Sequence, residues 1–274
     1  MRMWLKLWVR DALSVLGFGI RRLLRRRAPS GVRILLYHAV ADLAPAQDRW
    51  RMSVSPRLLA AHLAWLRRHG YMCVSLQEAV EMIQGRRPMA DKAVALTFDD
   101  GFRDVLTRAV PILERARAPA TLFVVAGRLG VPEPFPWLEH PTRFDRPLTW
   151  EELQALAGHP LVSVGSHAWS HRRLSGLPVD EQERDIVQSK AALERHLGRP
   201  VRWFAYPYGH AGSFSDETIG CLQRLGFEAA FANIMGVNRV GDSPWMLKRT
   251  RVGWEDRPWR FRLKMAGAYD WVDR

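Results

Sequence analysis

Four residues of the sequence have the types and spacing needed to bind a metal ion and use it. Asp99 and Asp100 are adjacent in AVALTFDDGFRD, and His167 and His171 lie four residues apart in SHAWSH. Adjacent carboxylates repel each other unless a positive group lies close by, and histidines at this spacing can chelate one cation from one side of a helical turn. Two histidines and one carboxylate leave a coordination position open for water. The pattern predicts metal-assisted hydrolysis, in which the carboxylate that does not bind the metal stays ionised and acts as a general base.

Two more polar groups follow predicted strands. His38 comes after the apolar run ILLY, and the turn YPYG, residues 206–209, follows VRWFA. Taken alone, each motif has a plainer interpretation: a buried core histidine, a simple turn, a solvated histidine pair or a capped Asp-Asp-Gly turn. Because all of them occur at the carboxyl ends of predicted strands, together they indicate one site.

The elements that must position these groups are strands alternating with helices. Ser55 and Pro56 begin a helix that Gly70 ends, and Ser75 with Glu78 and Thr149 with Glu152 predict capping boxes. The predicted strands cover residues 32–38, 72–76, 93–98, 120–125, 161–166, 201–206, 228–232 and 246–252, and the helices 56–70, 76–85, 102–117, 150–159, 180–197 and 215–225. This α/β alternation predicts a parallel sheet closed into a deformed (β/α) barrel, whose catalytic face lies at the carboxyl ends of the strands.

Composition narrows the class of protein. The 274 residues are 47% hydrophobic, enough for a large core. Cys73 and Cys221 lie far apart, which argues against a thiolate metal site or a disulfide framework. The formal net charge of +13 would attract any polyanion. Nucleic-acid binding would leave the metal-ligand pattern unexplained, so no specific nucleic acid is expected as a partner.

The N-terminal segment, residues 1–30, is predicted to be a basic amphipathic helix preceding a catalytic domain of residues 31–274. Its longest uncharged run, residues 12–20, is too short to span a bilayer, and no cleavable signal peptide is evident. An apolar stripe with the arginines of residues 21–27 outside it suits a helix lying in a membrane interface. We therefore expect a cytoplasmic protein, peripheral at the inner membrane face. A solvated basic extension and an uncleaved signal anchor are the alternatives.

The motifs TFDDG, SHxxSH and a Pro-aromatic-Gly turn, in this order, resemble those of the NodB-homology polysaccharide deacetylases, carbohydrate esterase family 4. These enzymes remove N-acetyl groups from glycans with a divalent metal bound on a deformed (β/α) barrel. The resemblance spans residues 32–252. It implies that Asp99 is the general base and that the Tyr208 N–H stabilises the oxyanion. It also implies that Asp100, His167 and His171 hold the metal, usually Zn²⁺.

Two departures from the family pattern are informative. Ala205 replaces the arginine that usually orients the base, so Arg249 or Arg251 must supply that cation, and Arg249 is the first choice. The late Leu-x-His motif that provides the general acid is absent after YPYG and occurs early, as LYH ending at His38. This order resembles the circularly permuted branch typified by poly-N-acetylglucosamine deacetylases. In a closed barrel the first and last strands are neighbours, so His38 can still reach the site as the acid.

The expected activity is removal of N-acetyl groups from an N-acetylhexosamine glycan, either lipid-linked or in exopolysaccharide or cell-envelope assembly. A deformylase of a lipid-linked amino sugar and a non-catalytic metal- or glycan-binding relative are the alternatives. The Pro-rich stretch of residues 130–148 is expected to face the substrate. Trp169 and Trp254 are candidates for an apolar wall around the acetyl methyl group, although an aromatic residue in a barrel is more often part of the core. Asp104 is expected to be a structural acid in the first turn of a helix, and His210 is the one other histidine expected near the substrate.

Overall fold

The computed structural model describes residues 10–12, 15, 31–138, 140 and 143–272. Most of the predicted N-terminal amphipathic helix lies outside these residues, so its form and the division of the chain at residue 30 stay predictions. None of the helices in the described part is long and apolar enough to cross a membrane.

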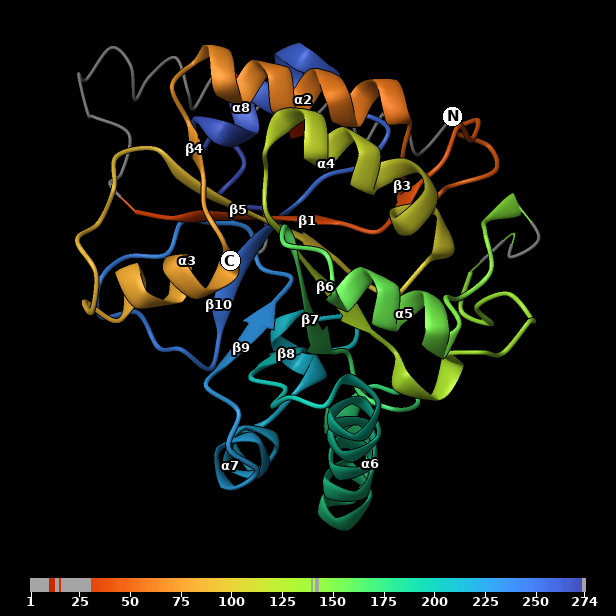
Figure 1. Cartoon of the computed structure of the whole chain (residues 1–274). Coiled ribbons are helices and arrows are strands. Elements are labelled where there is room, and N and C mark those ends of the chain that lie inside the picture. Colours follow the sequence, from red (N-terminus) through yellow and green to blue (C-terminus); the bar gives the residue numbers. More distant parts are fainter. Residues whose placement is uncertain (1–9, 13–14, 16–30, 139, 141–142, 273–274) are drawn as a thin grey trace.

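Seven parallel strands close into a barrel, as the sequence predicted (Figure 1). They are β1 (Arg33–Tyr37), β5 (Ala93–Phe98), β6 (Ala120–Val124), β7 (Val162–Ser166), β8 (Trp203–Ala205), β9 (Ala229–Ala232) and β10 (Leu247–Arg251). Strand β1 pairs with both β10 and β5, and this closes the ring. The first strand of the barrel in sequence, β1, therefore lies beside the last one, β10.

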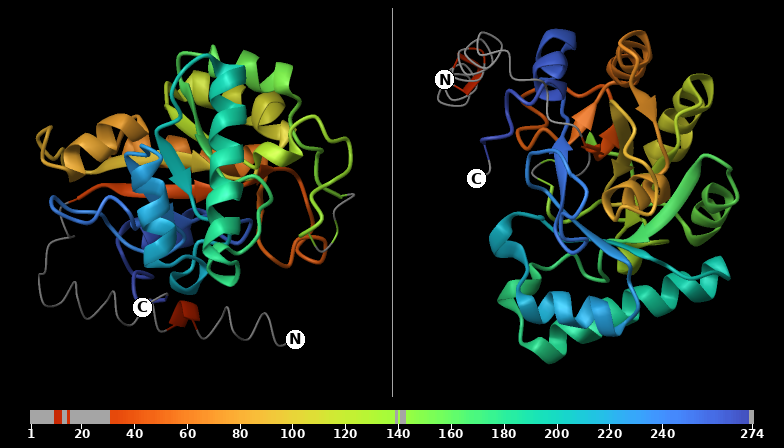
Figure 2. Two further views of the ribbon diagram at one scale, coloured as in Figure 1. Left: turned by 90° about the horizontal axis from the view of Figure 1, so that it is seen from below. Right: turned by 90° about the vertical axis from the view of Figure 1, so that its left-hand side faces the viewer.

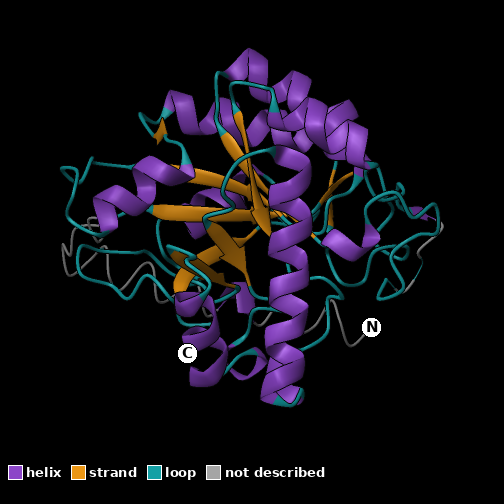
Figure 3. Cartoon of the chain, turned by 60° about the horizontal axis from the view of Figure 1, so that its bottom comes forward, coloured by secondary structure: helices purple, strands orange, loops and turns teal. Residues whose placement is uncertain are grey.

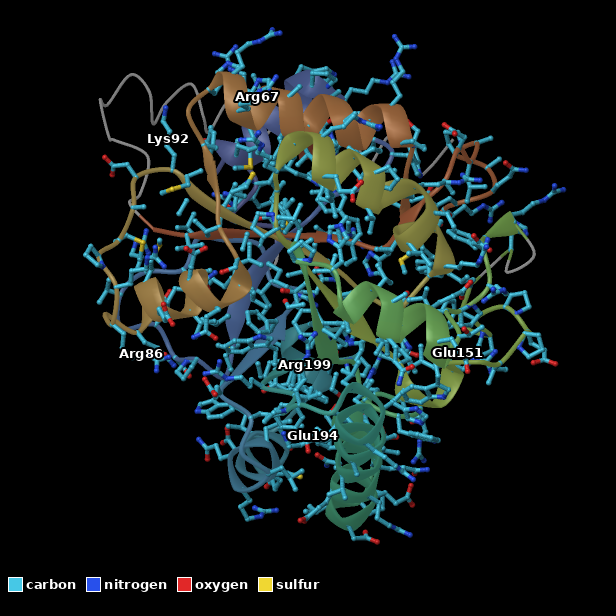
Figure 4. The ribbon with its side chains drawn as sticks, viewed as in Figure 1. Arg67, Arg86, Lys92, Glu151, Glu194 and Arg199 are labelled. Atoms are coloured by element: carbon cyan, nitrogen blue, oxygen red, sulfur yellow. The ribbon has the colours of Figure 1, made fainter. Side chains whose placement is uncertain are left out.

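Helices surround the ring of strands (Figure 3). They are α2 (Pro56–Arg68), α3 (Leu76–Ile83), α4 (Val110–Ala116), α5 (Trp150–Ala157), α6 (Val179–Leu197), α7 (Asp216–Arg224) and α8 (Pro258–Met265). In Figure 2 the long α6 and the shorter α7 run side by side on one flank. Both predicted capping boxes are present, at the starts of α3 and α5. Charged side chains on the outer surface, such as those of Arg67 and Glu151, are exposed (Figure 4).

Short elements complete the fold and account for the differences from the sequence prediction. Strand β4 (Met72–Cys73) is shorter than expected and pairs with β5 beside the ring. The two-stranded sheet of β2 (Ala39–Val40) and β3 (Ser53–Val54) and the helix α8 were not predicted. Short helical turns are η2 (Ala126–Arg128), η4 (Leu174–Gly176) and η5 (Ala211–Ser213).

Two predicted helix boundaries also differ. The helix predicted from residue 102 is helical from residue 103 and contains a π-helical turn, η1 (Val105–Ala109), before α4. Pro111 has no N–H to donate to the preceding turn, which favours a changed hydrogen-bond register there. The C-cap of α2 is His69 rather than Gly70, which follows it with a left-handed backbone, φ +72°.

Apolar side chains fill both faces of the strands. One buried cluster lies between the strands and the outer helices, and a second includes Ile34, Phe123, Trp203 and Phe231. Gly165 on β7 makes room for this second cluster, because a Cβ there would meet the Phe123 ring at 2.5 Å. The packed strands therefore hold in place the residues that follow the carboxyl end of each strand.

Candidate active site

One cleft of about 400 Å³ gathers every residue to which the sequence assigned a chemical role. Asp99 and Asp100 follow β5, and His167 follows β7 directly. The residues from the motifs that line the cleft are His38, Asp99, Asp100, His167, His171, Tyr208, His210, Arg249 and Arg251. The chemistry assigned to each residue stays a prediction.

Asp100, His167 and His171 form a compact, buried triad. The Asp100 Oδ1 atom lies 3.6 Å from His167 Nε2 and 3.5 Å from His171 Nε2. Two ligand atoms bound to one tetrahedral Zn²⁺ ion at normal bond lengths would lie about 3.4 Å apart. Both distances from Asp100 therefore have the spacing that a divalent cation needs, and all three ligand atoms lie within 4.8 Å of one another.

The electrostatics of the triad also suit a cation. Burial, and then the charge of Asp99, raises the pKa of Asp100 well above its usual value, so a positive ion is needed to keep this carboxylate charged. Burial lowers the pKa of both His167 and His171. Neutral imidazoles are the form that binds metal. The residues present thus fit a divalent cation.

Asp99 has a different environment from its neighbour. Burial would raise its pKa, but the charge and hydrogen bonds of the Arg249 guanidinium outweigh burial and lower it. Arg249 Nη1 and Nη2 donate to the two Asp99 carboxylate oxygens at 2.7 and 2.8 Å. Arg249 is fully buried, and its guanidinium lies over the Phe123 ring. Asp99 is therefore held ionised and oriented, as a general base must be.

Arg249, the first choice for the cation that orients the base, is thus paired with Asp99. Its position on β10 brings it across the barrel to Asp99. Arg251 also lines the cleft, two residues further along the strand. Alternating residues of one strand point to the same face, so both arginines are directed toward the site.

His38 lies beside Asp99 because of strand register. Tyr37 on β1 pairs with Phe98 on β5, and the Asp99 N–H donates to the Tyr37 carbonyl at 3.0 Å. The next residue along each strand is His38 and Asp99, respectively. Burial lowers the pKa of His38 to about 3, although Asp99 acts to raise it. His38 is therefore neutral in the free site.

The YPYG turn brings Tyr208 to the rim. Tyr208 and Gly209 both have left-handed backbone, with φ of +63° and +70°. A Cβ on Gly209 would meet Asn233 N at 2.6 Å, so only glycine fits at that position. The Tyr208 ring is half exposed and lies 5.0 Å from the His171 ring, centroid to centroid.

Left-handed backbone recurs around the triad. Asp100 and His171 have φ of +73° and +59°, and Ala168, next to His167, has +64°. Such conformations cost free energy for residues with a Cβ and persist only when the surroundings hold them in place.

The aromatic lining of the cleft differs from the prediction. Trp169 and Trp254 do not line it: Trp169 packs against Gly127 and the core, and Trp254 Nε1 donates to the Asp48 carbonyl at 2.8 Å. Their place is taken by Trp50 and Trp137, which the sequence analysis missed. The signal for Trp137 was its position in the Pro-rich stretch, which does reach the site.

A closed parallel barrel with a buried Asp-His-His triad and an arginine-paired carboxylate at its catalytic rim defines a barrel hydrolase. Comparison with known proteins makes the class specific. The sequence model described as polysaccharide deacetylase matches residues 86–230. The chain therefore belongs to the polysaccharide deacetylase family, and with it to the hydrolases that act on amide bonds.

Particular relatives cover most of the chain. The structure of IcaB from Ammonifex degensii is 31% identical, with a TM-score of 0.73 over 88% of this chain and 98% of that one. The Streptococcus pyogenes deacetylase PplD in complex with acetate is 25% identical, with a TM-score of 0.73 over 86% of this chain and 99% of that one. The Escherichia coli K12 poly-beta-1,6-N-acetyl-D-glucosamine N-deacetylase is 30% identical over 231 residues, 74% of this chain but 34% of that enzyme. The chain thus spans about a third of the length of the Escherichia coli relative.

Proposed function

We propose that this protein is a metal-dependent N-deacetylase that hydrolyses acetamide groups of an N-acetylhexosamine glycan. The observation that carries the proposal is the pairing of Asp99 with Arg249 beside the Asp100, His167 and His171 triad in one cleft. The Escherichia coli relative named for poly-beta-1,6-N-acetyl-D-glucosamine supports this glycan as the substrate. The acetate in the PplD structure agrees with an acetyl group as the one removed.

The proposed mechanism assigns one task to each group. A divalent cation held by Asp100, His167 and His171, for which Zn²⁺ suits the ligand set, would polarise the acetamide carbonyl and acidify water. Asp99 takes a proton from the attacking water, while Arg249 keeps its carboxylate charged and aimed. The Tyr208 N–H donates to the oxygen on which negative charge develops. The C–N bond breaks, and the products are acetate and a free amino sugar.

The leaving nitrogen also needs a proton, which we assign to His38. Because burial lowers the pKa of His38 to about 3, its imidazole is neutral before the reaction begins. The proton must therefore reach His38 during turnover. The source we assign is Asp99, once it has taken a proton from water, since the two residues follow neighbouring, paired strands.

We also propose that the protein works at the cytoplasmic surface of a membrane, on a glycan under assembly or linked to a lipid. The basic N-terminal segment supports this, as does Trp259, which is exposed near the C-terminus beside the exposed Arg257 and Arg262. The test is co-sedimentation of the full chain with vesicles of phosphatidylglycerol and phosphatidylcholine. Replacing the arginines of residues 21–27 with glutamine should abolish binding to the anionic vesicles; equal binding by the variant would refute this part.

The deciding experiment for activity measures both possible products. The zinc-loaded full chain is incubated with a short N-acetylated poly-β-1,6-glucosamine oligomer, and acetate and new amines are quantified. Asp99→Asn should keep the metal and release no acetate. A parallel assay uses an N-formylated, lipid-linked amino sugar. If the chain releases formate from this compound and no acetate from the oligomer, the deformylase alternative is favoured. Neither product, from a chain that still binds the oligomer, would indicate a non-catalytic relative.

A further inference from the structure

The two histidines of the triad are oriented in different ways. His167 Nδ1 lies 2.8 Å from the Ala205 carbonyl, a hydrogen bond that directs Nε2 toward Asp100. Histidines that bind metals usually have such a partner for their other ring nitrogen. His171 Nδ1, by contrast, is buried and has no hydrogen-bond partner among the described residues. Something other than a hydrogen bond must therefore hold the His171 ring.

Trp137 packs directly on that ring. The Trp137 and His171 rings are stacked, with centroids 3.9 Å apart and an angle of 18° between their planes. His171 also has strained, left-handed backbone, which needs tight surroundings to persist. The indole is therefore in a position to fix both the rotation of the imidazole and the turn that carries it.

The segment that carries Trp137 is anchored well enough for this task. The Trp137 ring contacts Phe135 at 4.9 Å between centroids, and Phe135 contacts Phe102 at 4.6 Å. Phe102 lies two residues after Asp100. A buried apolar cluster of Ala39, Phe102, Phe135, Leu138 and Phe144 holds the segment against the barrel. The indole is thus fixed to the same chain turn that presents the triad carboxylate.

The indole also brings a buried N–H donor to the cleft that Asp100 lines. Trp137 Nε1 and Asp100 Oδ2 are both buried, and neither has a hydrogen bond of good geometry in the described chain. Since Asp100 Oδ1 faces the two histidines, Oδ2 is the oxygen left for an N–H donor.

We propose that Trp137 is a positioning residue for the metal centre, holding the His171 ring by stacking and offering its unpaired N–H to the Asp100 carboxylate. The inference rests on the proposed function in one respect, that the triad binds a divalent cation. It assigns to an inserted surface segment the task that the Ala205 carbonyl performs for His167. Loss of such outer partners typically weakens metal binding about 10- to 100-fold.

The test measures metal affinity in the metal-free full chain, by titrating Zn²⁺ against a chromophoric chelator. Trp137→Leu keeps bulk but loses both the stack and the N–H, and should weaken zinc binding about 10- to 100-fold. Trp137→Phe keeps an aromatic face and loses only the N–H, and should weaken it about 3- to 10-fold. Trp150→Phe, at the start of α5, where the indole stacks on His196 away from the cleft, is the matched control and should bind as the wild type does.

The outcomes separate this inference from the proposed function. A wild-type chain that binds no zinc refutes the metal site itself. A wild type that binds zinc, with Trp137→Phe and Trp137→Leu both within twofold of it, overturns the role of Trp137. Unchanged zinc affinity with a raised KM alone would assign Trp137 to the substrate wall instead. Should Trp137→Leu fail to fold, Trp137→Phe decides the question, and the visible spectrum of its Co²⁺ form reports whether the ligand geometry has changed.

Discussion

Arg249 contacts Asp99 through both guanidinium Nη atoms from the strand that closes the barrel, and both side chains are buried. A two-point contact fixes the plane of the carboxylate as well as its charge. The contact therefore supplies from β10 a cation that lowers the pKa of Asp99 and fixes the direction of its carboxylate.

Replacing Arg249 with lysine should move the pH dependence of the reaction. Lysine keeps a positive charge but cannot form the two-point contact, so the pKa of Asp99 rises. The acid limb of kcat/KM should shift to higher pH, and kcat should fall about 100-fold because the base is misplaced. Arg251→Lys, on the same strand, should leave the acid limb in place. An unshifted limb in Arg249→Lys would mean that Arg249 does not set the pKa of the base.

Replacing His38 should separate proton delivery from metal binding. His38→Gln removes the group that protonates the leaving nitrogen and leaves the triad ligands intact. We expect kcat to fall about 10²- to 10⁴-fold, with zinc content by elemental analysis equal to that of the wild type. Full activity would remove His38 from the reaction.

Asp104 should make stability depend on pH in an unusual direction. It is buried, its carboxylate oxygens lack partners in the described chain, and burial raises its pKa to about 7. The unfolded pKa is about 3.9, so between these values the folded chain binds more protons than the unfolded one. The contribution of Asp104 therefore destabilises the fold progressively as the pH rises from about 4 to 7.

Asp104→Asn, which is neutral at every pH, tests this. The metal-free variant should melt above the wild type at pH 8, by an amount on the order of a few kcal/mol in the free energy of unfolding. At pH 5 the gain should be much smaller. Equal gains at both values would show that the carboxylate is not protonated in the fold.

A buried ion pair between α8 and the preceding loop should matter for stability. Lys264 Nζ donates to Asp256 Oδ2 and to the Arg251 carbonyl, each at 2.6 Å. Lys264→Met leaves the buried carboxylate without its nearest cation and should cost about 3–5 kcal/mol in urea unfolding. Adding Asp256→Asn should recover part of the loss. Lys92→Met, at an exposed position, is the control. If Lys264→Met lowers the free energy of unfolding no more than Lys92→Met does, the ion pair does not stabilise the fold.

The parts of the fold that the sequence predicted are those governed by local pattern. Ser75 with Glu78 and Thr149 with Glu152 marked helix starts, and the motif residues could be placed because each follows a strand end. Closure of the barrel followed from alternation, and with it the approach of His38 to Asp99. These features depend on neighbours in sequence or on the topology of the whole ring.

The parts that were missed depend on partners distant in sequence. The stack of Trp137 on His171 requires Phe102 and Phe144 to hold an irregular segment in place, which no periodicity reveals. The low pKa of His38 and the high pKa of Asp104 both arise from burial. Trp169 and Trp254, candidates for an apolar wall, do not line the cleft, and Trp169 packs against the core. Side-chain direction in a loop cannot be read from spacing.

Among the described non-glycine residues, seven have positive φ, and four of them are at the rim: Asp100, Ala168, His171 and Tyr208. Relieving the backbone strain at any one of these residues should raise the free energy of unfolding, since each left-handed residue costs about 1–2 kcal/mol. Ala168→Gly is the plainest case. Substitutions selected only for a higher melting temperature should therefore occur at this rim and should lower turnover. Thermal stability and catalysis thus place opposite demands on the same few backbone angles.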